Sequence, residues 1–242
     1  SFTIPFNVSA HGGKLWISGA DKAQYGLVFA RTANDKGRNG VTCFIVDTDT
    51  PGFAVRRIVH TLRSAHYATE LSFEDMRVPA SNILGELNKG FAIANDRLTK
   101  QRIPYAAGCI GVAIKAQEMA LEYVPQRETF GAPLSSRQSI QGRRVDNEID
   151  IKQSLWITLE AAAKAERGEN FRKEAAMAKL VATEAGGRVV DRCMQMFGGL
   201  GVAKDLPFER WFREMRIRRI GEGPSEVQRH VIARELLGSS LR

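Results

Sequence analysis

Cysteine is scarce in this sequence of 242 residues, which holds three, at Cys43, Cys109 and Cys193. Their number is odd and their spacing is wide, so the sequence predicts neither a disulfide framework nor a metal site of paired cysteines, and we expect a reducing compartment. The four histidines also lack the spacing that is typical of metal ligands. No residue is therefore proposed as a metal ligand.

Long apolar runs are also missing. No stretch of roughly 18 apolar residues occurs, so no membrane span is predicted. The first six residues lack the basic region and apolar core of a signal peptide, and we do not expect secretion. Negative charge is the minority: 35 Lys and Arg against 27 Asp and Glu give a net charge of +8, which favours anionic partners such as phosphate-bearing ligands, an acidic protein or nucleic acid.

The sequence changes character near residue 87. Before it, short β-branched and aromatic runs alternate with turn signals, among them the polar cluster at residues 34–40. After it, apolar residues recur at helical spacing, and long helices are expected over about 90–126, 136–167 and 171–197, with shorter ones from about 207 and 225. Strands and helices in separate blocks predict an α+β fold, with a small antiparallel β-barrel or sandwich at 1–86 and a C-terminal antiparallel four-helix bundle at 87–242.

One carboxylate stands directly before a Gly-Pro break, in Glu222-Gly223-Pro224, after which Ser225 is expected to cap a new helix. A carboxylate on such a linker is not committed to a helix surface. It can project into a cleft beside backbone N–H groups and act as a general base. A solvated loop glutamate is the simpler alternative, and the motif alone does not decide between them.

Three more motifs suggest a phosphate-bearing, flat cofactor. In Arg127-Glu-Thr-Phe-Gly-Ala-Pro-Leu134, a guanidinium near a hydroxyl and a ring can hold a pyrophosphate and a flat ring system, although an exposed interhelix turn is the alternative. Gln195-Met-Phe-Gly-Gly-Leu-Gly201 ends a helix in a Gly-rich turn that suits either a phosphate or a plain helix cap. Trp16-Ile17-Ser18 can wall a flat ligand or place a tryptophan in a core.

Together with Asp47-Thr-Asp-Thr-Pro-Gly52, Phe73-Glu-Asp-Met-Arg-Val-Pro79 and Asn82-Ile-Leu-Gly85, these motifs make the chain from Lys14 onward resemble the acyl-CoA dehydrogenase family of flavoproteins. The resemblance implies the second half of the family's middle β domain, followed by its C-terminal bundle. It also implies FAD as cofactor and an acyl-CoA thioester as substrate. The family's N-terminal helical domain has no counterpart in this sequence, so we expect a fragment.

The resemblance assigns roles by position. Glu222 is similar to the base that removes the α-proton while the β-hydride passes to flavin N5, and its backbone N–H would polarise the thioester carbonyl. Thr99, Arg102 and Gly223 would contact substrate. The positions that match FAD contacts, several of them to a neighbouring subunit's FAD, are Trp16, Ser18, Arg127, Thr129, Phe130, Gln138, Gln195, Phe197, Gly198, Gly199, Pro224 and Glu226.

Two departures from the family pattern matter. Pro224 stands where a threonine hydroxyl commonly contacts flavin, which puts that contact in doubt. Thr99 stands where some straight-chain members carry an acidic residue near the CoA moiety. Some branches place the catalytic glutamate on the first bundle helix, where this sequence has Gln101, so Glu222 is the candidate base.

The resemblance also implies partners and a compartment. Cofactor sharing implies a homodimer or homotetramer. The electron acceptor would be an electron-transfer flavoprotein, and the compartment the bacterial cytoplasm or the mitochondrial matrix. The alternatives are an acyl-CoA oxidase, or a non-catalytic DNA-associated or dimerisation member of the same fold. Nucleic acid is not an expected partner, because the positive charge is dispersed and Glu222 is present.

Overall fold

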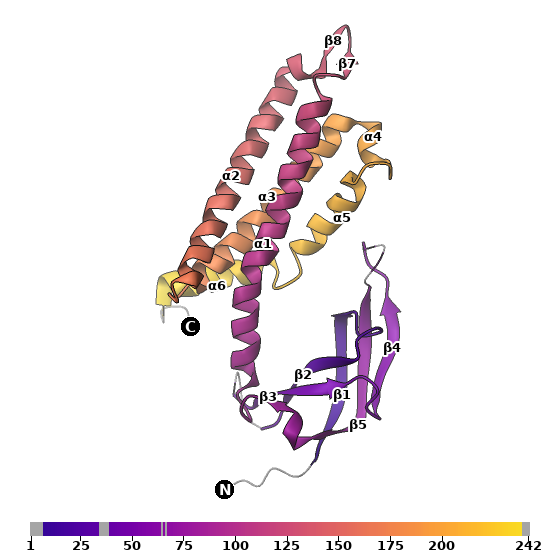
Figure 1. The fold of residues 1–242 in the computed structure, drawn as a ribbon, viewed down its shortest axis with the longest axis vertical. Coiled ribbons are helices and arrows are strands. Elements are labelled where there is room, and N and C mark those ends of the chain that lie inside the picture. Colours follow the sequence, from indigo (N-terminus) through magenta and orange to yellow (C-terminus); the bar gives the residue numbers. More distant parts are fainter. Residues whose placement is uncertain (1–6, 34–38, 64, 66, 239–242) are drawn as a thin grey trace. The chain divides into compact units, whose positions relative to one another are not determined.

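A computed structural model describes residues 7–33, 39–63, 65 and 67–238 of the chain. These residues form two compact units, 1–97 and 98–242 (Figure 1). Most of the turn cluster predicted at 34–40 lies outside the described residues, and the domain boundary expected at 86/87 stays a prediction. No helix within the described ranges is long and apolar enough to cross a membrane.

The first unit contains two antiparallel sheets of three strands each. One sheet has the order β1-β5-β4, with β1 at Asn7–Ser18, β4 at Phe53–Val59 and β5 at Ala68–Pro79. The other has the order β2-β3-β6, with β2 at Tyr25–Arg31, β3 at Val41–Asp47 and β6 at Ile83–Leu84, which follows a 3-10 turn at Ala80–Asn82.

Both sheets contribute to one apolar core. Val28, Phe44 and Val46 come from the second sheet, and they pack with Leu71 and Phe73 of β5 from the first. Within the described part of the chain no strand pairing joins the two sheets. The small antiparallel sheets of the expected β domain are therefore present, and inward side chains from both of them form its core.

The start of the long helix α1 (Gly90–Tyr123) contacts β3 closely. A Cβ added to Gly90 would lie 2.5 Å from the backbone nitrogen of Cys43, so only glycine fits without a shift. Just before it, the Asn88 N–H donates to the Thr42 hydroxyl at 2.8 Å, and Val41 bridges to Lys89. The first turn of α1 therefore belongs to the packing of the β unit.

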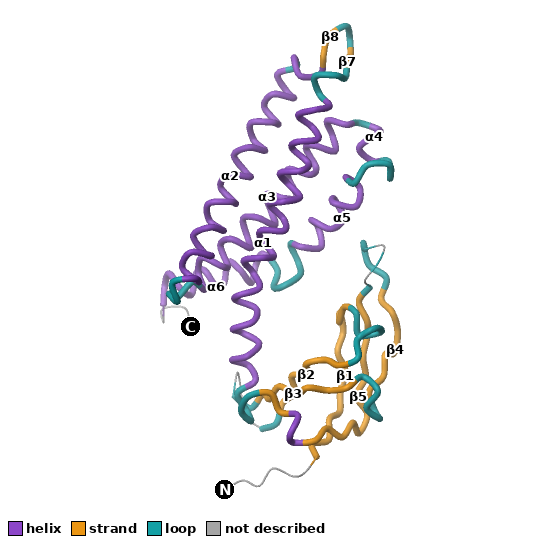
Figure 2. Tube along the Cα trace, viewed as in Figure 1, coloured by secondary structure: helices purple, strands orange, loops and turns teal. Residues whose placement is uncertain are grey.

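Helices make up nearly all of the second unit (Figure 2). α2 spans Gln138–Glu166 and α3 spans Arg172–Phe197, and the shorter helices are α4 (Gly199–Val202), α5 (Phe208–Arg218) and α6 (Ser225–Leu237). A small hairpin, β7 (Glu128–Thr129) and β8 (Ala132–Pro133), and a 3-10 turn at Leu134–Ser136 join α1 to α2. The predicted α+β class, with small antiparallel sheets and a C-terminal helical domain, is confirmed, and α1 continues through Pro104.

Small buried residues let the long helices approach one another. On α1 they recur three or four residues apart, at Ala106, Cys109, Ala113, Ala116 and Ala120. This spacing places them on one face of the helix. α2, α5 and α6 all pack against α3, which makes α3 the central helix of the bundle.

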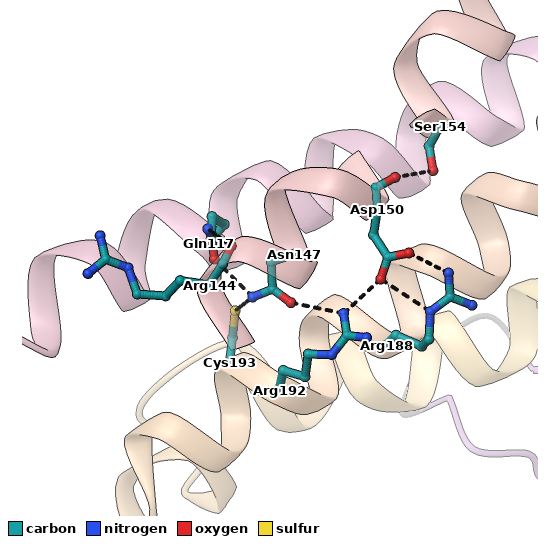
Figure 3. A network of polar contacts seen from close by, with 8 residues as sticks. All are labelled: Gln117, Arg144, Asn147, Asp150, Ser154, Arg188, Arg192 and Cys193. Atoms are coloured by element: carbon teal, nitrogen blue, oxygen red, sulfur yellow. Dashed lines mark hydrogen bonds and ion pairs between the residues drawn. The ribbon is translucent and has the colours of Figure 1, made fainter. Parts of the chain in front are cut away.

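A buried polar network links the three long helices (Figure 3). Asn147 of α2 donates to Gln117 of α1 at 2.9 Å and accepts from Arg192 of α3 at 3.3 Å. Asp150, also on α2, accepts from Arg192 at 2.7 Å and from Arg188 at 2.5 and 3.2 Å. Burial raises the pKa of the Asp150 carboxyl, but these hydrogen bonds outweigh it and hold that pKa below its usual value.

Candidate functional site

The turn between α5 and α6 carries Glu222 in a left-handed conformation, with a φ of 56°, followed by Gly223 at 91°. Left-handed backbone is uncommon for a residue with a side chain and persists where the surroundings fix it. The Gln228 side chain supplies one such restraint, since its Nε2 donates to the carbonyls of Glu222 and Gly223 at 3.2 and 2.9 Å.

The expected helix cap at Ser225 is wrong. Pro224 occupies the N-cap position, and no side-chain capping bond is made there within the described chain. Ser225 is the first residue of α6, and its buried hydroxyl donates to Glu184 of α3 at 2.7 Å instead. Glu184 also pairs with Arg219 at 2.8 Å. The serine therefore ties the turn to α3 rather than closing its own helix.

Buried polar atoms without partners gather beside this turn. Glu222 Oε2 is buried without a hydrogen-bond partner among the described residues, and the same holds for Nε and Nη1 of Arg102. Burial lowers the pKa of the Arg102 guanidinium, Arg172 lowers it further, and Glu222 acts in the opposite direction, so the two side chains are within electrostatic reach. Because buried polar atoms are almost always paired in folded proteins, the arrangement points to a ligand that supplies the missing partners.

Two other predicted substrate residues lie close to this cluster. Thr99 is buried on α1, three residues before Arg102, so both occupy one face of the helix. The Gly223 carbonyl is already engaged, because Lys179 of α3 donates to it at 2.8 Å. Lys179 was not singled out from the sequence, although it shares the face of α3 on which Ala175 and Ala182 are buried.

A concavity of about 490 Å³ is lined by six of the predicted cofactor residues. Its lining includes Arg127, Thr129, Gln195, Phe197, Gly198 and Gly199. The Phe197 ring stacks on Tyr123 with centroids 4.2 Å apart, which gives the pocket a rigid aromatic floor. A Cβ built at Gly198 or Gly199 would meet no atom of the described chain within 4 Å, so the turn borders open space and a ligand can approach its backbone.

The hairpin beside this pocket carries Phe130, whose side chain is 99% exposed and whose φ is 51°. Arg137 holds the hairpin by donating to the Thr129 carbonyl at 2.6 Å. The sequence motif did not single out Arg137, and the one signal for it is its place three residues after the motif ends at Leu134. Gln138 is exposed at the start of α2.

In the β unit, Trp16 is 65% exposed with a φ of 67°, beside an irregularity in the β1–β5 pairing between Lys14 and Ile17. The alternative of a core tryptophan is therefore wrong. Ser18 lines a pocket of about 340 Å³ with Leu71 and Phe73. Of the remaining positions, Pro224 is half-buried and Glu226 is exposed in the first turn of α6.

Comparison with known proteins matches both units. Residues 88–237 match the acyl-CoA dehydrogenase C-terminal domain, and residues 7–76 match the acyl-CoA dehydrogenase middle domain. The mitochondrial short-chain specific acyl-CoA dehydrogenase of Bos taurus is 39% identical over 229 residues, which cover 94% of this chain and 56% of that protein.

Solved structures are similar as well. Butyryl-CoA dehydrogenase from Megasphaera elsdenii is 38% identical with a TM-score of 0.89, over 96% of this chain and 61% of that one. PigA with FAD and proline is 28% identical with a TM-score of 0.90, over 93% and 59%. The chain thus spans less than two thirds of the length of each of these relatives.

Proposed function

Because the chain belongs to the acyl-CoA dehydrogenase family, we propose that it carries the catalytic base and part of the cofactor site of an enzyme that dehydrogenates an acyl-CoA thioester. The observation that carries the proposal is the unpaired, buried Oε2 of Glu222 beside the unpaired, buried donors of Arg102. Glu222 would offer its carboxylate oxygen as an acceptor, and Arg102 of α1 would offer Nε and Nη1 as donors, to the same ligand.

Glu222 is proposed to take the α-proton. Its Oε2 has no hydrogen bond to give up within the described residues, so its lone pairs remain for an incoming proton. The left-handed backbone at residue 222 and the hydrogen bond from Gln228 fix the backbone position from which the carboxylate side chain extends. Arg102 is proposed to donate to a polar atom of the bound thioester, with Thr99 on the same helix face.

The concavity lined by Arg127 and Gln195 is proposed to hold part of FAD. Arg127 and Thr129 supply donors for phosphate oxygens, and the backbone of Gly198 and Gly199 is open to close approach. Gln195 and the stacked Phe197 line the same space. When bound, FAD would supply the acceptor for the two electrons that leave the substrate. Trp16 and Ser18 of the β unit, with Phe130, Gln138, Pro224 and Glu226, stay predicted cofactor contacts.

An apolar stripe on α2 supports a homodimer or homotetramer. Val145, Ile149, Trp156 and Leu159 are exposed at spacings that place them on one side of the helix. Large apolar side chains exposed along one side of a helix are consistent with an interaction site. We also propose an electron-transfer flavoprotein as electron acceptor, as the family resemblance implies, and the bacterial cytoplasm or mitochondrial matrix as the compartment.

The test is an anaerobic absorbance titration of the FAD-reconstituted protein with acyl-CoA thioesters. It begins with butyryl-CoA, because the similar proteins are named for short-chain and butyryl substrates. Bleaching of the oxidised flavin band is expected. Glu222→Gln should slow it by about 10² to 10⁴-fold, the usual contribution of a positioned base, whereas Glu118→Gln, an exposed change on α1, should not. Flavin that binds but never bleaches would refute the proposed reaction, and failure to bind flavin would favour the dimerisation-core alternative.

A further inference from the structure

We propose that Lys179 is a positioning residue, whose buried ammonium group fixes the turn that carries Glu222. The inference rests on the proposed function, because it concerns the placement of the proposed base. It adds a residue of α3 that does not itself reach the substrate.

The burial of Lys179 calls for an explanation. Its side chain is 0% exposed and is among the largest fully buried side chains of the described residues. Lysine is almost never fully buried unless its charge is paired or hydrogen-bonded, because desolvating an ammonium ion is costly. A side chain that only filled space in the alanine-rich face of α3 would be cheaper as an apolar residue.

The contacts of Lys179 explain the burial. Its Nζ donates to the Gly223 carbonyl at 2.8 Å and lies 3.4 Å from the Arg219 carbonyl. These two carbonyls lie on either side of Glu222 along the chain, so one ammonium group holds both ends of the turn. The Tyr105 ring of α1, with its centroid 5.9 Å from Nζ, lies beside the same group.

The turn needs such a restraint because its geometry is strained. A left-handed glutamate relaxes when the surroundings stop holding it. Gln228 and Ser225 hold the turn from within α6, since Gln228 donates to Gly223 and the Ser225 N–H donates to Arg219 at 3.2 Å. From the central helix α3, Glu184 already holds Ser225 and Arg219. Lys179 adds a second link from α3, and this link reaches the carbonyl of the residue directly after Glu222.

Lys179 is mostly protonated at neutral pH, although its surroundings lower its pKa. Burial lowers the pKa of Lys179 to about 8, and Arg102 of α1 acts in the same direction. Cys109 of α1, Glu184 of α3 and Glu222 itself act in the opposite direction. The Tyr105 ring, which lies beside Lys179, also has the guanidinium carbon of Arg218 of α5 at 4.7 Å from its centroid.

The variant to make is Lys179→Met, which keeps the volume and removes the donors. It should fold, because each carbonyl keeps another donor: Gly223 keeps Gln228, and Arg219 keeps Ser225. Lys179→Gln serves as the second variant, since its amide nitrogen can still donate a hydrogen bond but carries no charge. The matched control is Lys164→Met, which breaks a 2.6 Å bond from α2 to Glu174 and leaves the turn untouched.

The first measurement needs no cofactor: amide hydrogen exchange of peptides that cover residues 219–228. Losing a hydrogen bond from a charged donor should speed exchange there by about 10- to 100-fold in Lys179→Met. Lys179→Gln should show a smaller change and Lys164→Met none. Unchanged exchange in folded Lys179→Met would overturn the inference, whatever the enzyme's activity.

The second measurement is steady-state turnover of the FAD-reconstituted full chain. A base displaced by about 1 Å costs on the order of 100-fold in kcat, so Lys179→Met should lose kcat with little change in KM, and Lys179→Gln should recover part of it. If the wild type reduces flavin and Lys179→Met turns over at the same rate, the inference fails while the proposed function stands. If the wild type never reduces flavin, the proposed function fails and the inference falls with it.

Discussion

Replacing Asp150 by asparagine measures how much one buried charge contributes to the stability of the bundle. The carboxylate accepts one hydrogen bond from Arg192 at 2.7 Å and two from Arg188 at 2.5 and 3.2 Å (Figure 3). Asparagine keeps the shape but removes the negative charge, so both guanidinium groups lose their counter-ion.

The magnitude follows from the exposure of the partners. Removing one member of a buried ion pair costs about 3–5 kcal/mol. Arg188 is 48% exposed and regains water, which reduces its share. Arg192 is better covered but keeps the Asn147 oxygen at 3.3 Å. We therefore expect Asp150→Asn to lower the free energy of unfolding by about 2–3 kcal/mol.

The assay is urea denaturation followed by helical circular dichroism at pH 7. Glu148→Gln on the same helix is the matched control, because its pair with Lys152 is exposed at 3.8 Å and should be worth under about 0.5 kcal/mol. The pKa of the folded Asp150 carboxyl lies below its unfolded value near 3.9. Its contribution is therefore complete above about pH 4 and disappears as the pH falls through the folded pKa. Equal losses in the two variants at pH 7 would refute the reasoning.

Three further predictions address the site. Phe130→Ala should change the free energy of unfolding by no more than about 0.5 kcal/mol, because the ring is exposed. The same change should weaken FAD affinity up to about tenfold in a fluorescence titration, and unchanged affinity would remove Phe130 from the cofactor site. Gly201→Ala should cost about 1–3 kcal/mol in urea denaturation, because its Cβ would lie 2.3 Å from the Met194 carbonyl, whereas Gly199→Ala has open space, and equal costs would contradict this. The free energy of unfolding of the wild type, relative to that of Lys179→Met, should rise by up to about 3 kcal/mol as the pH rises from about 8 to 10.5. In that range Lys179 is deprotonated in the folded protein but still protonated in the unfolded chain. A difference that does not change with pH would show that this lysine titrates normally.

Local patterns in the sequence were enough to predict the class of fold. Alanines three and four residues apart on α1 indicate a helix that packs closely on its neighbours, and the β-branched runs of β3 and β5 indicate strands. The Ser225 cap was wrong because its competing partner, Glu184, lies far away in sequence. No local rule weighs a contact of that kind.

The candidate site divides in the same way. The resemblance singled out Glu222 and the two pocket motifs, but the unpaired atoms of Arg102 and the burial of Lys179 depend on how α1, α3 and the turn meet. A lysine in a helix is expected to reach water, so only its alanine neighbours hinted otherwise. The Trp16 motif alone left a core position open, because the strand pattern does not show the irregularity in the β1–β5 pairing beside this exposed residue.

The close packing of Gly90 and Asn88 against β3 has a consequence for the nascent chain. Chains are made from the N-terminus at roughly 5–20 residues per second. When β3 has been synthesised, β2 is already available to pair with one of its edges. Its other edge stays unpaired for roughly 2–10 s, until β6 and the first turn of α1 have been synthesised. An unpaired strand edge is a template for wrong pairing. We expect this protein to depend most on chaperones during the time between the synthesis of Cys43 and that of Gly90.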